Sequence, residues 1–141
     1  MKSVRDLLLL LPILLMLPAG CGGPSDGRLV VTGEVRFDGQ PVTLGSISFK
    51  TLGKGPSVGG KIVDGQFRIA EKGPTAGEYQ VMIQGMRETG RMVAVDRAFP
   101  DQKEAEMEQY IPTQYNSRSE LKENISPSNT HLVFELSSTK P

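Results

Sequence analysis

The chain has 141 residues, which is enough for one domain. Its 16 basic and 16 acidic side chains balance, so it lacks the positive excess that phosphate backbones select, and we expect no nucleic-acid partner. Its 16 glycines and 10 prolines separate short apolar runs, a pattern typical of strands and turns. The single cysteine, Cys21, excludes an internal disulfide, so the fold must depend on a buried core.

Residues 1–20 have the composition of a secretory signal peptide. Lys2 and Arg5 supply a short positive region, and an apolar run follows over residues 7–17. As a helix, that run would cross only about half of the ~30 Å hydrocarbon core, so it is too short for a comfortable membrane anchor. We therefore expect a signal-peptide helix in residues 1–20 and a flexible, glycine-rich tether in residues 21–27.

Residues 17–21, LPAGC, form a motif where the signal peptide ends and the tether begins. Small residues directly before a cysteine resemble the lipobox of bacterial lipoproteins, although Pro18 stands where that family prefers leucine. The resemblance implies cleavage before Cys21 and a lipid anchor on it, which would make the membrane a partner. Gly22, in place of aspartate, favours the outer membrane by the same resemblance. Two alternatives stay open: ordinary secretion with cleavage after Ala19, and an uncleaved segment.

Alternating apolar and polar side chains predict seven strands after the tether. They span residues 29–37, 45–51, 61–63, 66–69, 78–83, 121–125 and 131–136. Because one face of each strand is apolar, the pattern predicts an all-β fold. We expect an antiparallel sandwich of about seven strands in a domain spanning residues 28–138.

Three local signals refine this prediction. Asp64-Gly65 favours the positive φ angles of a two-residue hairpin turn. Gly33, inside a strand, indicates a bulge or the close approach of another backbone. Tyr79, at the start of a strand, is expected to hydrogen-bond back to the preceding loop and fix its corner.

The segments VTGEVRFDGQPVTLGSISF, DGQFRI and GPTAGEYQVMI, and later YIPTQYNSRSEL, resemble a family of small bacterial lipoproteins. The single domain of that family is similar to the carboxypeptidase regulatory-like, transthyretin-like β-sandwich, an Ig-like fold. The resemblance covers most of residues 29–137. It implies a structural, adhesive or accessory module and brings no catalytic residues with it.

Residues 87–110 interrupt the strand pattern with many charges. We expect a charged loop insertion there, with a helical turn that begins at Pro100-Asp101 and ends near Gln109. Two interpretations stay open for this insertion: a binding loop at one end of the sandwich, and a solvated excursion without a role.

The chain shows no pattern of catalysis. His131 is the only histidine and begins a strand, where an exposed position is expected. Asp64 is explained by its turn, and Glu104, Glu106 and Glu108 lack the spacing of a calcium loop. We therefore expect no enzyme, no cofactor and no metal site.

The sequence thus favours a non-enzymatic module of the cell envelope. We expect it to be lipid-anchored, at the outer membrane or on the periplasmic side, and to meet an envelope protein or glycan partner. The alternative is a carbohydrate- or small-ligand-binding module. Its candidate aromatic side chains are Phe99, Tyr110 and Tyr115, and it requires them to cluster on one exposed surface.

Overall fold

The computed structural model describes residues 26–53 and 55–139. These residues form nine strands and one short 3-10 helix. The elements are β1 (Val31–Phe37), β2 (Gln40–Pro41), β3 (Leu44–Thr51), β4 (Val58–Val63), β5 (Gln66–Ile69), β6 (Gly77–Asp96), β7 (Phe99–Gln109), η1 (Thr113–Tyr115), β8 (Lys122–Ile125) and β9 (His131–Leu136). The predicted signal-peptide helix and Cys21 lie outside the described residues.

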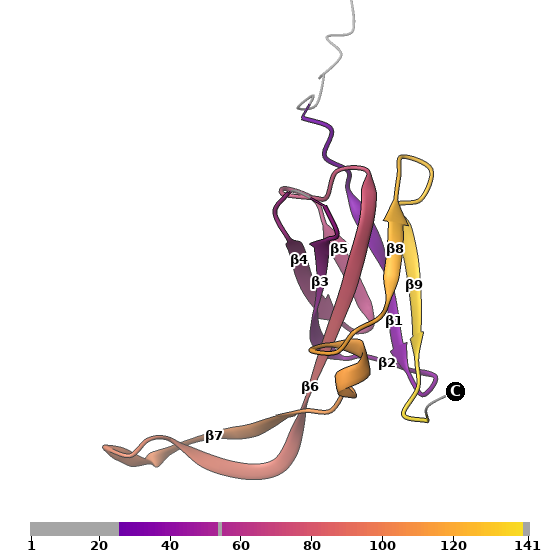
Figure 1. The fold of residues 1–141 in the computed structure, drawn as a ribbon. Helices are drawn as coiled ribbons and strands as arrows, with labels where there is room; N and C mark the ends of the chain where they lie inside the picture. Colours follow the sequence, from indigo (N-terminus) through magenta and orange to yellow (C-terminus); the bar gives the residue numbers. More distant parts are fainter. Residues whose placement is uncertain (1–25, 54, 140–141) are drawn as a thin grey trace, which may run out of the picture.

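The nine strands belong to one sheet with the order β2-β1-β5-β4-β3-β6-β7 (Figure 1). In addition, β8 pairs with the first residues of β6, and β9 pairs with β1. All these pairs are antiparallel except β1–β9, which is parallel. Among the described residues β8 pairs with β6 and β9 with β1, and only the turn between them carries a bridge, from Ser126 to Asn129, so the sheet is not closed.

The all-β prediction is confirmed, but the number of strands is higher than seven. Two strands were not expected. The short strand β2 pairs with the end of β1, where Arg36 lies opposite Pro41. The strand β7 occupies most of the segment for which we expected a charged loop.

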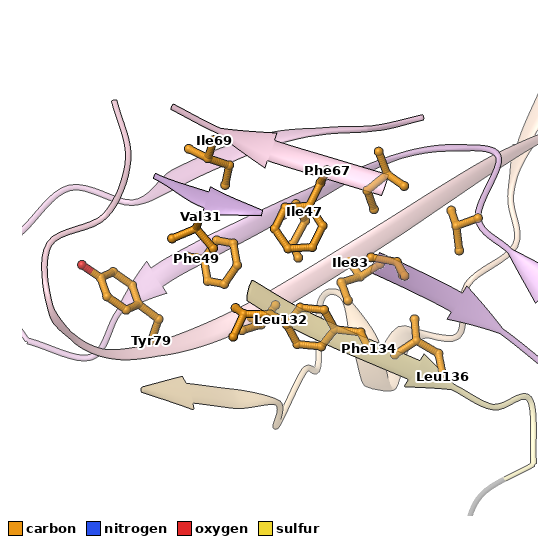
Figure 2. Packing of buried hydrophobic residues seen from close by; sticks show 14 of the residues in the cluster. Val31, Ile47, Phe49, Phe67, Ile69, Tyr79, Ile83, Leu132, Phe134 and Leu136 are labelled. Atoms are coloured by element: carbon orange, nitrogen blue, oxygen red, sulfur yellow. The ribbon is translucent and has the colours of Figure 1, made fainter. Parts of the chain in front are cut away.

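The core lies where the inward faces of β1, β3, β4, β5, β6, β8 and β9 meet. Figure 2 shows side chains of β1, β3, β5, β6 and β9 converging on one cluster. The Phe49 ring lies 6.2 Å from the Phe67 ring and 6.3 Å from the Tyr79 ring, centroid to centroid. The Phe67 ring in turn lies 6.3 Å from Phe134 on β9. The alternation predicted for these strands is confirmed, because their inward apolar residues are buried, except Leu29 and Phe37, which are partly buried against the core.

Two Asp-Gly pairs make the tight turns of the body. Asp38 and Gly39 have φ angles of 49° and 78°, and Asp64 and Gly65 have 51° and 77°. Positive φ at both central residues is the signature of the two-residue hairpin turn whose twist matches the flanking strands. The predicted role of Asp64 in a turn is confirmed. Asp38 also accepts a hydrogen bond from the Ser138 amide at 2.8 Å, which lowers the pKa of its carboxyl group.

The other two local predictions are also confirmed. A Cβ atom at Gly33 would lie 2.0 Å from the carbonyl oxygen of Leu132, so only glycine lets β1 and β9 come this close. The Tyr79 hydroxyl donates to the carbonyl oxygen of Thr75 at 3.0 Å and thereby ties the start of β6 to the loop before it.

Candidate interaction surface

The strand β6 is 20 residues long, and its two ends have different surroundings. As far as Met86 it pairs with β3 in the body of the domain. Beyond Met86 it pairs with β7 as far as Asp96. This two-stranded ribbon leaves the body and extends to one side (Figure 1). We call the ribbon, residues 87–109, the arm.

The predicted loop with a helical turn at Pro100–Gln109 is therefore wrong, although the bounds of the segment were close. The acids Glu104, Glu106 and Glu108 recur at every second residue, so in a strand they share one face. Basic residues on β6 lie beside two of them. This period of two favours a strand, and the structure realises it as β7.

One face of the arm is held together by ion pairs. The Arg87 Nε atom lies 2.7 Å from Glu108 Oε1, and the Arg91 Nε atom lies 2.7 Å from Glu106 Oε2. The Thr89 hydroxyl also donates to Glu106 at 2.7 Å. This hydrogen bond, together with Arg91, lowers the pKa of the Glu106 carboxyl group. Each exposed pair is weak alone, but together they specify the register of the two strands.

The other face of the arm carries large apolar side chains among Glu88, Asp96, Lys103 and Gln109, whereas Val93 and Val95 lie on the ion-paired face. Residues directly opposite each other in an antiparallel pair share a face, as do alternate residues of one strand. The pairs on this face are Met86–Gln109, Glu88–Met107, Met92–Ala105, Ala94–Lys103 and Asp96–Phe99. Met92 is 60% exposed, Phe99 59% and Met107 38%, so these large side chains are not covered by the body. Contiguous exposed apolar side chains of this kind mark interaction sites.

The apolar face continues from the arm onto the body. Leu44 on β3 lies directly opposite Met86, and Val63 on β4 lies directly opposite Leu44. Leu44 is 45% exposed and Val63 53%. We call this continuous set the apolar stripe. It consists of Val63, Leu44, Met86, Met107, Met92, Ala105, Ala94 and Phe99.

The base of the arm is fixed to the body by Tyr110. Its ring packs edge-on against Phe37 with centroids 5.7 Å apart, and the Arg87 guanidinium lies 5.2 Å from the ring centre. Partial burial raises the pKa of the Tyr110 hydroxyl. The Tyr110 amide donates to the Gly85 carbonyl at 3.0 Å, so the return of the chain from β7 is held against β6.

The arm leaves the domain at the end opposite to the start of the described chain. Leu29 donates its amide to Pro74 at 2.8 Å, and Arg28 forms a β-bridge with Thr75, next to the start of β6. From there β6 runs the length of the body before the arm begins (Figure 1). The Arg28 end of the body and the base of the arm are thus separated by about 30 Å, at ~3.3 Å per residue of β6.

The histidine and the acids of the arm lie in different parts of the described structure. His131 is exposed at the start of β9, as predicted, and its Nδ1 atom lies 3.1 Å from the Thr32 hydroxyl. Within residues 26–53 and 55–139, no three His, Cys, Asp or Glu side chains are grouped as metal ligands. The acids of the arm lie on an exposed ribbon, well away from this histidine in the fold.

A hollow of about 440 Å³ lies at the end of the body opposite to the arm, between the loop after β3 and the loop before β6. Arg28, which lines it, pairs with Asp26 at 2.8 Å. Tyr79, which also lines it, donates to the loop carbonyl of Thr75. Arg28 and Tyr79 therefore already have partners within the chain.

The three candidate aromatic residues do not cluster. Phe99 lies exposed near the tip of the arm, and Tyr110 packs at its base. Tyr115 lies in η1, partly buried against the core, and its hydroxyl donates to the Ser137 carbonyl at 3.2 Å. The structure therefore separates the three side chains that a carbohydrate platform requires together.

The sequence-based reasoning missed Leu44, Met86, Met92 and Met107. They belong to different strands, and only the register places them side by side. The period of two in β7 was the available signal, since it separates Ala105 and Met107 from the acids on either side.

No protein-family model, curated protein or solved structure matches this chain. What the structure establishes is a small all-β domain with a mainly antiparallel, open sheet. No helix in the part of the chain that the structure describes has the length and hydrophobicity to cross a membrane.

Proposed function

We propose that this protein is a non-enzymatic lipoprotein of the cell envelope that binds a partner protein through the apolar face of its arm. The finer fold that we propose for the body is the transthyretin-like β-sandwich of the carboxypeptidase regulatory-like domains. In this proposal the lipid anchor is on Cys21, after removal of residues 1–20.

The observation that carries the proposal is the exposure of the apolar stripe on a ribbon that has left the body. A two-stranded hairpin in water is marginally stable by itself. Here the arm presents Met92 and Phe99 to solvent at 60% and 59% exposure. Methionine side chains are flexible and polarizable, which suits them to a contact surface. A partner that covers this face would stabilise the ribbon and bury the apolar side chains.

The position of the arm supports a role at the envelope. A lipid on Cys21 would hold the Arg28 end of the body near the membrane, because only a short tether separates the two residues. The arm would then project from the far end of the body, about 30 Å further from the surface. That orientation leaves the apolar stripe accessible to a protein in the same compartment.

The alternative of a carbohydrate- or small-ligand-binding module has less support. Such sites present aromatic faces together, and Phe99, Tyr110 and Tyr115 lie apart. In the hollow that it lines, Arg28 pairs with Asp26, and Tyr79 donates to the Thr75 carbonyl, so these two polar groups already have partners within the chain.

Site-specific photo-crosslinking in cells tests the contact. A photoreactive amino acid replaces Met92 on the apolar stripe, and in a matched control it replaces Val133, which is 54% exposed on β9 of the body. We expect a discrete adduct from position 92 and none from position 133. The same substitution at Phe99 gives a second position on the apolar stripe. If positions 92 and 99 both give no adduct in the intact cell, the proposed contact is wrong.

Membrane anchoring is tested separately with Cys21→Ala in the full chain, with Ser25→Ala as a control in the same tether. We expect Cys21→Ala to move the protein out of the detergent-rich phase and Ser25→Ala to leave it there. An unchanged distribution of the Cys21→Ala protein would refute the lipid anchor but not the contact made by the arm.

A further inference from the structure

The apolar face of the arm is arranged almost symmetrically about its middle pair, Met92 and Ala105. On β7, Lys103 lies two residues to one side of Ala105 and Met107 two residues to the other side. Glu88 lies directly opposite Met107. Each opposed residue pair on this face is one level of the arm. Lys103 lies one level to one side of the middle pair, and Glu88 lies one level to the other side. No described ion pair uses either of them.

This arrangement is self-complementary. When two arms pack face to face in antiparallel orientation about a two-fold axis at Met92, Lys103 of each copy comes to the level of Glu88 in the other. The large Met107 side chain comes to the level of the small Ala94 side chain of the other copy. A two-fold interface uses the same surface on both subunits, so it requires complementarity of this kind.

The ends of the arm extend the match. Phe99 near the tip lies opposite Asp96, four residues beyond Met92, and Gln109 lies four residues beyond Ala105 in the other direction. In the antiparallel arrangement the tip of one arm therefore reaches the level of Met86 of the other copy. Leu44 lies beside Met86, so the exposed Phe99 ring has an apolar surface to cover.

We propose that the partner of the arm is a second copy of this chain, bound through face-to-face antiparallel packing of the two apolar faces. The inference rests on the proposed function, because it names the partner of the same surface. The choice of a second copy as the partner follows from the opposite charges of Glu88 and Lys103 at equivalent levels and from Phe99, which reaches the level of Met86 of the other copy at each end.

Pairing of two copies through the edge of β7 is disfavoured. That strand carries Asp101, Glu104, Glu106 and Glu108 against the single cation Lys103, so two copies placed edge to edge would repel. Pro100 also lacks the amide hydrogen that an added strand requires. Packing of the faces avoids both problems, because Glu104, Glu106 and Glu108 lie on the face opposite to Ala105 and Met107.

The interface is small, and this sets its strength. The face covers about five residue levels, or about 30 Å by 10 Å, which is below the ~800 Å² per partner of a standard stable complex. We therefore expect a weak dimer in dilute solution. Attachment of both copies to one membrane would raise their effective concentration and favour the pair.

Charge reversal tests the pairing. The full chain, purified in mild detergent, is examined by native mass spectrometry as wild type, Lys103→Glu, Glu88→Lys and the double variant. Each single variant places like charges at both contacts, so we expect its dimer to dissociate at least tenfold more readily. The double variant should restore the dimer. A mixture of the two single variants should form a heterodimer, because the two acidic side chains of one variant then meet the two basic side chains of the other.

The outcomes separate the two proposals. A wild type that stays monomeric up to about 100 µM, or single variants that dimerise as well as the wild type, would overturn pairing with a second copy. The Met92 adduct obtained in cells then decides the proposed function. An adduct with the mass of two chains supports both proposals. An adduct with another mass leaves the proposed function standing without the second copy. If neither position 92 nor position 99 gives an adduct, both proposals are refuted. Circular dichroism of every variant verifies that the sheet is folded.

Discussion

The close contact of β1 and β9 at Gly33 predicts a large effect of one methyl group. In Gly33→Ala the added Cβ atom would lie 2.0 Å from the backbone oxygen of Leu132 and 2.7 Å from the Phe67 ring. Real Cβ atoms essentially never come within 3.0 Å of such neighbours, so the Leu132 carbonyl must recede by about 1 Å. The Phe67 ring can rotate, but the carbonyl moves only if β9 moves with it.

The cost follows from what β9 contributes. Its parallel ladder with β1 runs from Thr32–His131 to Phe37–Leu136. Loss of two of these hydrogen bonds costs about 1–3 kcal/mol, and the overpacking itself costs about 1–3 kcal/mol. We therefore expect the free energy of unfolding to fall by about 3 kcal/mol, a large part of the ~5–15 kcal/mol typical of a domain.

Urea unfolding of residues 26–141, followed by circular dichroism and tyrosine fluorescence, measures this loss. Gly53→Ala is the matched control, since a Cβ there meets nothing nearer than the Thr51 hydroxyl at 4.0 Å and the backbone φ is ordinary. We expect the control to remain within about 0.5 kcal/mol of the wild type. A loss below about 1 kcal/mol in Gly33→Ala would show that β1 and β9 are not in the contact described.

Two further predictions concern single hydrogen bonds. The Thr89 hydroxyl holds the pKa of Glu106 below its usual 4.5, so this carboxylate favours the folded arm above that pH and loses its contribution as the pH falls through the lowered pKa. NMR titration should place its midpoint below 4.5, and Thr89→Ala should raise it; an unchanged midpoint would contradict the contact. Tyr79→Phe removes the hydroxyl that donates to the Thr75 carbonyl at 3.0 Å, so unfolding in urea should show a loss of about 1 kcal/mol. Tyr115→Phe, which removes the bond to the Ser137 carbonyl, is the control for a lost hydroxyl elsewhere, and a stability equal to wild type in Tyr79→Phe would refute the corner.

The body of the domain was largely predictable because its signals are local. Alternation in residues 131–136 identifies Leu132, Phe134 and Leu136 as buried and His131 as exposed, and the structure agrees. Asp64-Gly65 predicts its own turn, because the positive φ angles depend only on these two residues. Gly33 predicted a close approach but not the identity of the approaching strand.

The arm was not predictable in the same way, because its charges concealed its pairing. Glu104, Glu106 and Glu108 alternate as a strand requires, yet nothing local shows that Arg87 and Arg91 lie beside two of them. A charged segment without a core-facing side resembles a loop. In the structure this segment is a ribbon, because β6 continues past the body and β7 pairs with that extension.

The amino-acid sequence by itself determined the all-β class, the faces of the body strands and the positions of their turns. These depend on a period of two and on the backbone preferences of single residues, which act within a few residues of one another. The tertiary structure alone decided the parallel pairing of β1 with β9 and the alignment of Leu44, Met86 and Met92 into one stripe. Alternation states which side of its own strand a residue occupies, but the neighbouring strand and its register depend on contacts between distant parts of the chain.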